Sequence, residues 1–217
     1  MKYQIKINTG DLPPSTGCLF WSDADCAHVC ALQPLDDTPD TLWNYNSGST
    51  YVLSRISLTK RGDPQWNNYE YPKRKLFWPI GAHSAYIEYQ ANHIFLGGGS
   101  GYATARDWAR FGLLYLNNGV WIDGTRILPD WWSAYASAEQ PVYSGYGAGF
   151  WRMADIDTQA YYASGFRNQN VYIFPRQKLV IARLAMPPLA AHPLYDQYNF
   201  ITSILQCFPN APKADKL

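Results

Sequence analysis

The spacing of the apolar residues changes once along this chain, and that change limits the fold classes open to it. Over residues 105–116 apolar side chains recur every three or four residues, which predicts a helix that Thr104 can cap. Beyond about residue 146 the spacing falls to two, which predicts strands. These strands are expected at residues 147–152, 161–164, 170–174 and 179–185. Because the strands follow one another, we predict an α+β fold with a largely antiparallel sheet packed with helices.

Three further helices are predicted from local signals at their ends. Ser47 or Ser49 can cap a helix over about residues 50–59. Pro129 can occupy the first position of another helix, where its missing N–H costs nothing. A last helix is expected over about residues 195–207, where apolar side chains return to helical spacing.

The composition is that of a folded domain of ordinary charge. Of the 217 residues, 47% are hydrophobic and 16% are charged, which excludes a disordered or highly charged protein. We find no internal repeat or linker, so residues 1–217 are expected to form a single domain, with loop-like structure over residues 1–40. No apolar run approaches the roughly 18 residues that a membrane span needs, and the N-terminal segment is too polar for a signal peptide.

The basic residues do not form a nucleic-acid-binding pattern. The formal net charge is +1, and the longest basic cluster is Lys73-Arg74-Lys75. Such a short cluster is typical of a solvated loop or helix end, whereas a nucleic-acid interface needs an extended basic surface. Nucleic acid is therefore not expected as a partner.

Three cysteines lie close together near the N-terminus. Cys18, Cys26 and Cys30 fall within thirteen residues, with His28 between the last two, and Cys207 stands alone. The cluster is compatible with one local disulfide, with reduced thiols or, less readily, with zinc. Structural zinc sites usually contain two Cys-x-x-Cys pairs, which are absent here, so neither a metal nor a cofactor is expected.

Several segments, in a consistent order, resemble serine hydrolases of the β-lactamase and penicillin-binding-protein superfamily. The branch that contains 6-aminohexanoate-dimer hydrolases and esterases is the most similar. The resemblance covers roughly residues 5–206 and is carried by residues 42–53, 97–119, 121–132 and 162–175. It implies a β-lactamase/transpeptidase-like fold whose N-terminal elements are missing from this chain. By the same resemblance the protein would be periplasmic or secreted.

Residues 42–53 resemble the second signature of that superfamily, a Tyr or Ser two residues before an Asn or Ser. The resemblance implies that Tyr45 is the catalytic tyrosine and that Ser47 is a polar residue facing the cleft. A phenol with a pKa near 10 becomes a useful base at neutral pH only where a cation lowers that value. The alternative for Tyr45 is a packing role under the following helix.

Residues 162–175 resemble the third signature in its plainer form, Ala-x-Gly followed by Gln, here Gln169. Gly165 would let a substrate lie close along the strand edge. The resemblance implies that the backbone N–H of Phe166 points into an oxyanion hole. Many relatives have His or a small residue at the position of Phe166, so this cleft would differ from theirs. An ordinary strand with a glycine bulge is the alternative.

The first signature, Ser-x-x-Lys, supplies the nucleophile of the family. Ile7-Asn8-Thr9-Gly10 resembles the segment that follows the helix of this signature, so the signature would be expected several tens of residues before Ile7. The chain contains one such spacing, Ser57-Leu-Thr-Lys60, but it follows Tyr45 and stands at the end of a predicted helix. We therefore do not expect Ser57 to be the nucleophile. Without the lysine, Tyr45 would stay protonated near neutral pH.

The resemblance implies an enzyme that cleaves small amides or esters through an acyl-enzyme, with this chain as its C-terminal portion. Lys-Thr-Gly, which would help to hold the carboxylate of a β-lactam, is absent. The alternative is a catalytically inactive homologue that binds a ligand or a partner, or a gene remnant. Because the N-terminal strands of the family would be missing, the sheet would expose an edge through which the chain could self-associate.

Overall fold

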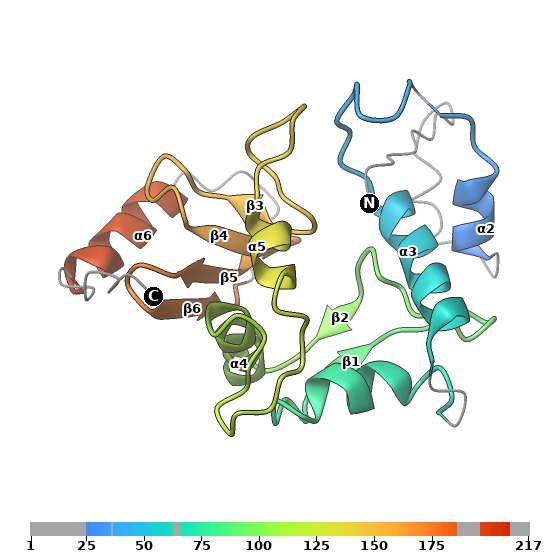
Figure 1. Cartoon of the computed structure of the whole chain (residues 1–217), viewed down its shortest axis with the longest axis horizontal. Helices are drawn as coiled ribbons and strands as arrows, with labels where there is room; N and C mark the ends of the chain where they lie inside the picture. Colours follow the sequence, from blue (N-terminus) through green and yellow to red (C-terminus); the bar gives the residue numbers. More distant parts are fainter. Residues whose placement is uncertain (1–24, 36, 63–65, 186–195, 209–217) are drawn as a thin grey trace. The chain divides into compact units, whose positions relative to one another are not determined.

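The structure is a computed structural model that describes residues 25–35, 37–62, 66–185 and 196–208. The chain divides into two compact units, Met1–Thr104 and Ala105–Leu217 (Figure 1). Each unit is treated by itself, and the single domain predicted for residues 1–217 stays a prediction. Across the described ranges, no helix has both the length and the apolar character that a membrane crossing requires.

Unit 1 is built around helix α3 (Ser47–Lys60). The helix begins where it does because Asn46, in an extended conformation, accepts a hydrogen bond from the N–H of Ser49 at 3.0 Å. The predicted cap, Ser47 or Ser49, is therefore wrong: both serines lie inside the first turn. An Asn side chain places its carbonyl oxygen where a cap must be, and the helix is three residues longer at its start and one residue longer at its end than the predicted 50–59.

A short helix, α2 (Cys26–Ala31), packs alongside α3 and corrects the prediction of loop structure for this region. Asp25 caps α2 by accepting the N–H of His28 at 3.0 Å. Its buried side chains are small, Cys26, Ala27 and Cys30, so they let the two helices approach closely. Residues 1–24, which were also predicted to be loop-like, lie outside the described residues.

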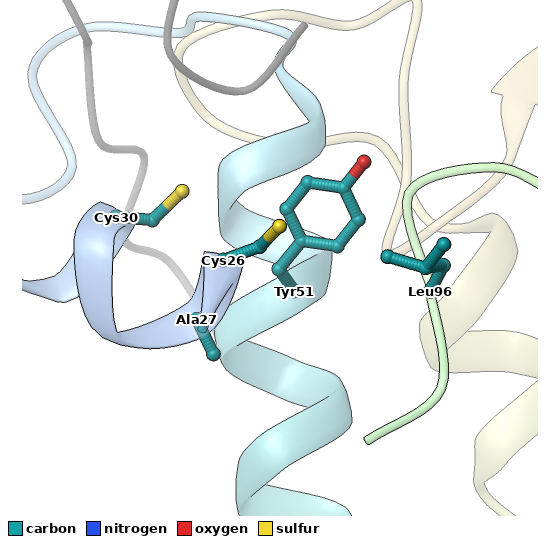
Figure 2. Close-up of a cluster of buried hydrophobic side chains, with 5 residues drawn as sticks. All are labelled: Cys26, Ala27, Cys30, Tyr51 and Leu96. Carbon is teal, nitrogen blue, oxygen red and sulfur yellow. The ribbon is translucent and has the colours of Figure 1, made fainter. Parts of the chain in front are cut away.

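The core of unit 1 joins three separate segments (Figure 2). Tyr51 of α3 is fully buried and lies between the cysteines of α2 and Leu96, which comes from a later loop. Removing an aromatic side chain of this size from water stabilises the fold by about 2–3 kcal/mol. The contact with Leu96 therefore attaches the later loop to α3.

That loop belongs to a segment that folds back on itself. This segment follows a π-helical turn, η1 (Lys73–Phe77). It contains two antiparallel strands, β1 (Tyr86–Ile87) and β2 (Gly101–Tyr102), and the loop with Leu96 joins them. Between these strands, the N–H of Leu96 donates to the carbonyl of Glu88 at 2.9 Å. The loop is thereby held at two points, one on the pair β1–β2 and one on the core of unit 1.

Unit 2 contains a four-stranded sheet in the order β3-β4-β5-β6 (Figure 1), and it is antiparallel, as predicted. Strands β4 and β5 pair from Tyr161↔Ile173 to Gly165↔Gln169, and β5 and β6 pair from Asn170↔Arg183 to Phe174↔Leu179. The strands are β3 (Trp151–Arg152), β4 (Tyr161–Gly165), β5 (Gln169–Phe174) and β6 (Leu179–Arg183).

Both faces of strand β5 are buried. Ile173 belongs to a cluster with Tyr115 of helix α4 (Ala105–Leu116), whereas Tyr172 and Phe174 belong to a second cluster with Ile201 of helix α6 (Gln197–Gln206). Successive side chains of a strand point to opposite faces, so the two clusters lie on the two sides of the sheet. Strand β5 therefore forms the centre of unit 2.

The bounds of α4 match the prediction, whereas β3, β6 and α6 are shorter than predicted. Strand β3 begins only at Trp151, because Gly147 donates to Phe150 at 2.8 Å and Gly149 has a φ of 98°, which closes a turn over the predicted start. Helix α5 (Trp132–Ser137) begins three residues after Pro129.

Candidate functional site

Tyr45 and Ser47 flank Asn46, the residue that caps α3. The side chain of Tyr45 is 54% exposed, and its ring centroid lies 6.4 Å from that of Trp43. Ser47 is half-buried at the first position of the helix. The cap fixes both residues, because an extended Asn46 turns the chain sharply from loop to helix. The structure thus places the two predicted residues together at the N-terminus of α3.

The glycine segment 97–99 lies directly against this end of α3. The hydroxyl of Ser47 donates to the carbonyl of Gly98 at 3.4 Å. A β-carbon on Gly98 would fall 2.7 Å from the Cβ of Ser47 and 2.9 Å from Cε1 of Tyr51. A β-carbon on Gly97 would meet the hydroxyl oxygen of Ser54, one turn further along. Only glycine allows so close an approach, so this segment determines where Ser47 lies.

This contact was missed in the sequence. The glycines before Ser100 suggest flexibility, but a run of glycines also marks a place where one backbone must pass close to another. In this chain the glycines mark such a close approach. Gly97 and Gly98 pack along α3 and connect the candidate site to the core residue Leu96.

The electrostatics around Tyr45 do not favour a phenolate. Partial desolvation raises the pKa of the Tyr45 phenol above its ordinary value of 10.0. At neutral pH the side chain is therefore a neutral phenol, which can donate a hydrogen bond but is a poor base. For general-base catalysis, a cation brought near the phenol oxygen would have to reverse this shift.

The one Ser-x-x-Lys spacing in the chain is a surface feature of α3. Ser57 is exposed and donates to the carbonyl of Ser54 at 2.8 Å, and Lys60 is the last residue of the helix. Ten residues separate Ser57 from Ser47 on α3, which at 1.5 Å per residue is about 15 Å. This geometry agrees with the expectation that Ser57 is not the nucleophile.

In unit 2, Gly165 ends strand β4 and Phe166 begins the hairpin turn to β5. Arg167 and Asn168 follow with φ angles of 61° and 63°, which form the tight turn. The side chain of Phe166 is 82% exposed, with the guanidinium carbon of Arg167 5.4 Å from its ring centroid. Gly165 and Phe166 therefore lie at the tip of the β4–β5 hairpin.

The end of β4 that carries Gly165 forms part of a sheet edge. Within the described residues, β3 pairs with β4 only at Tyr161 and Tyr162, so Ala163 to Gly165 pair with β5 alone. The edge groups of β4 there face away from the sheet, as a strand edge that binds an extended ligand requires. The roles of Gly165 along this edge and of the Phe166 N–H both stay predictions.

A clamp that the sequence did not reveal holds the hairpin tip. The side chain of Gln169 hydrogen-bonds both the N–H and the carbonyl of Ala185, the former at 2.9 Å. Arg183 donates to the carbonyl of Asn168 at 2.8 Å. Gln169, singled out as part of the third signature, therefore connects the tip to the end of β6.

The four predicted site residues fall into two pairs, one in each unit. Tyr45 and Ser47 lie together in unit 1, and Gly165 and Phe166 lie together in unit 2. The catalytic roles of all four residues stay predictions.

The cysteine cluster is described only in part. Cys26 and Cys30 are buried in α2, Cys207 is exposed at the end of α6, and Cys18 lies outside the described residues. Among the residues that the structure describes, no group of three or more metal-binding side chains comes together. The local disulfide stays a prediction.

Comparison with solved structures identifies two proteins of similar fold. One is named as a 6-aminohexanoate-dimer hydrolase from Bacillus anthracis, with a TM-score of 0.63 and 26% identity over 82% of this chain. The other is named as a β-lactamase from Bacteroides dorei DSM 17855, with a TM-score of 0.59 and 15% identity over 82% of this chain. Both are consistent with the predicted superfamily, and the predicted fold class is confirmed.

The chain is shorter than these relatives. It spans 48% of the first structure and 60% of the second, about half the length of each. No protein-family model matches the sequence, and no curated protein matches it either. The family likeness is therefore carried by the fold and by the motifs described above.

Proposed function

We propose that this chain, whose fold is that of the β-lactamase-like serine hydrolases, is the C-terminal portion of an enzyme that cleaves amide or ester bonds. In this proposal an acyl-enzyme forms on a serine of a Ser-x-x-Lys segment that lies outside this chain. Tyr45 relays the proton between that serine and the leaving group, and Ser47 faces the substrate. The N–H of Phe166 helps to bind the oxyanion, and Gly165 leaves room for the substrate along β4.

The close packing of Gly98 against Ser47 carries this proposal. A loop that merely covered the end of a helix would not need a glycine within van der Waals contact of the first helical residue. Here the approach fixes Ser47 and, through the Asn46 cap, the Tyr45 that precedes it. Rigid placement of a polar pair at a helix N-terminus is what a proton relay requires.

The proposed reaction requires a cation near Tyr45. The raised pKa of Tyr45 leaves the phenol neutral, and the lysine of Ser-x-x-Lys would supply the positive charge that lowers it. The substrate would be a small amide or a carboxyl ester. A β-lactam is less well supported, since the chain has no Lys-Thr-Gly triplet to hold a carboxylate.

The raised pKa of Tyr45 also supports the second candidate, a catalytically inactive homologue that binds a ligand or a partner. A neutral phenol 54% exposed beside Trp43 is suited to hydrogen bonding and stacking without catalysis. The two candidates differ in one respect: only the hydrolase needs a nucleophile.

The test is made on the protein as its native cell produces it, captured through a C-terminal tag. The hydrolase proposal expects a mass above that of this chain and a fluorophosphonate adduct on a serine outside residues 1–217. Turnover of a chromogenic ester should fall at least about 100-fold in Tyr45→Phe. Tyr198→Phe is the matched control, because Tyr198 is similarly exposed, at 55%.

Two outcomes would contradict the hydrolase proposal. An adduct on Ser57 would assign the nucleophile to this chain after all. The absence of any adduct, together with turnover that Tyr45→Phe leaves unchanged, would favour the inactive homologue.

Self-association through a sheet edge is a further part of the proposal. The described sheet ends in β6 on one side and in the short strand β3 on the other. A strand edge of this kind can pair with a second copy. Sedimentation of the purified protein across a concentration series would detect such a dimer.

A further inference from the structure

A surface of unit 1 combines positive charge with tryptophan. It consists of Trp66, Lys73, Arg74, Lys75 and Trp78, and we call it the basic–aromatic patch. Arg74, Lys75 and Trp78 are exposed, and Trp78 keeps 43% of its surface accessible. An exposed indole beside consecutive cations is unusual on a surface that serves only to keep a protein in solution.

The local fold places the three cations on this surface. Asn67 accepts the N–H of Glu70 at 2.9 Å and so caps the turn that leads into η1. The N–H of Trp78 then donates to the carbonyl of Lys73 at 2.8 Å, which closes the wide π-helical turn. Phe77, the last residue of η1, and Ile80, which follows the turn, are buried. These anchors fix the turn and leave its basic residues outside.

The charges and the indoles of the patch are in contact. The guanidinium carbon of Arg74 lies 5.8 Å from the ring of Trp66 and 5.3 Å from that of Trp78. The ammonium nitrogen of Lys75 lies 4.9 Å from the ring of Trp66. Glu70 accepts a hydrogen bond from Arg74 at 2.9 Å. Over residues 61–78 the sequence has four basic residues, Arg61, Lys73, Arg74 and Lys75, and two acidic residues, Asp63 and Glu70, so this stretch is positive overall.

We propose that the basic–aromatic patch binds the anionic surface of a phospholipid bilayer. Indole rings favour the headgroup region, where their apolar body and polar N–H are both accommodated. Lys and Arg beside them are attracted to anionic headgroups, and the two contributions add. The chain as a whole has a net charge of only +1, so the attraction is local to this patch.

The same contacts argue against a nucleic acid as the ligand. Binding of single-stranded nucleic acid relies on bases that stack on open aromatic faces. In the patch, the cations of Arg74 and Lys75 lie over the tryptophan rings. Binding at a membrane interface does not require that the faces of the tryptophan rings be open for stacking.

The test measures how the whole chain sediments with vesicles of phosphatidylcholine, with and without phosphatidylglycerol. We expect binding only to the anionic vesicles, and we expect salt to weaken it. Each basic residue near a charged bilayer contributes about fivefold to partitioning, so Lys73→Glu with Lys75→Glu should weaken it by at least about 25-fold. Trp78→Ala should weaken it separately, by several-fold.

Matched controls separate the patch from general effects. Arg106→Glu with Lys178→Glu makes the same change in net charge at exposed sites of unit 2. Trp131→Ala removes an indole that is 58% exposed, also in unit 2. Both controls should bind like the unmodified chain, and circular dichroism of each variant checks that it is folded. Lys75→Gln is a milder second variant, expected to bind about fivefold more weakly.

Three results would overturn the proposal. The first is equal binding to neutral and anionic vesicles, and the second is equal loss in the patch variants and their controls. The third is binding to single-stranded RNA, or to another soluble polyanion, that is lost in the patch variants while vesicle binding is absent.

Discussion

Gly98 and Ser47, which lie 51 residues apart in the sequence, pack so closely that no side chain fits between them. The Ser47 hydroxyl donates to the Gly98 carbonyl, and a β-carbon on Gly98 would lie 2.7 Å from that of Ser47. The contact joins the most glycine-rich segment of the chain to the helix that carries the candidate site. It therefore makes the site depend on the packing of a distant loop.

Replacing Gly98 with alanine should destabilise unit 1. The added methyl group would overlap Ser47 and Tyr51, and overpacking of this kind costs about 1–3 kcal/mol in the free energy of unfolding. The change is measured by denaturant unfolding together with hydrogen exchange of the α3 amides. Gly62→Ala is the matched control, because nothing lies within 4 Å of its added carbon. Equal effects of the two substitutions would contradict the close packing.

Gly165→Ala should leave the stability of unit 2 nearly unchanged. The nearest atoms to the added carbon, both of Gln169, lie 3.3 Å away, a close contact that a shift of a few tenths of an ångström would relieve, and Gly165 does not have a positive φ. We expect a change within about 0.5 kcal/mol in thermal unfolding. In the native enzyme the same variant should bind a substrate analogue more weakly, since the methyl group occupies the β4 edge. A large loss of stability would mean that the glycine is needed for the fold.

Asp25 should stabilise α2 in two separable ways. Desolvation raises the pKa of Asp25, but the His28 N–H and the Arg55 guanidinium together bring it below its ordinary value of 3.8. Asp25→Ala removes both the cap and the charge and should cost about 1 kcal/mol in unfolding free energy at neutral pH. Asp25→Asn keeps the cap and loses only the charge.

The pH dependence distinguishes the two contributions of Asp25. Because the folded-state pKa is lowered, the charge contribution is fully present above pH 3.8 and is lost as the pH falls through the lowered value. Unfolding curves of the native chain and Asp25→Asn should therefore converge in acid. Curves that remain equally far apart at every pH would refute this assignment.

Tyr89 should make the fold sensitive to alkali. Desolvation, with smaller contributions from Tyr86 and Tyr69, raises the pKa of Tyr89 to about 12 from the ordinary 10.0. The folded state then holds the phenol proton more tightly than the unfolded state. Its stability is therefore retained up to pH 10 and decreases between pH 10 and about 12. In Tyr89→Phe this decrease should be smaller, whereas in Tyr198→Phe it should be unchanged.

The parts of the fold that local signals specify could be predicted from the sequence. Helix α4 has the predicted bounds because Thr104 precedes it and Asn117-Asn118-Gly119 follow it. Strands β4, β5 and β6 lie at nearly the predicted positions, but the apolar residues of β5 are consecutive, because both faces of that strand are buried. Helix α2 was missed because its six residues are too few to show a period and its buried side chains are small.

The candidate site was predictable residue by residue but not in its contacts. Tyr45, Ser47, Gly165 and Phe166 come from short motifs, each of which can be found locally. The approach of Gly98 to Ser47 and the clamp between Gln169 and Ala185 join distant parts of the sequence, and no local pattern encodes them. The raised pKa of Tyr45 likewise depends on desolvation, which only the folded structure defines.

The strand order β3-β4-β5-β6 has a consequence for how unit 2 reaches its native state. Each strand pairs with the next one along the chain, and the pairs Gly165↔Gln169 and Phe174↔Leu179 close loops of only a few residues. Short loops keep the contact order of the sheet low, and low contact order favours rapid folding. The four-stranded sheet can therefore form one hairpin at a time. The first hairpin can form at either of the two turns that flank β5, and the pairing of these strands requires no segment outside the sheet.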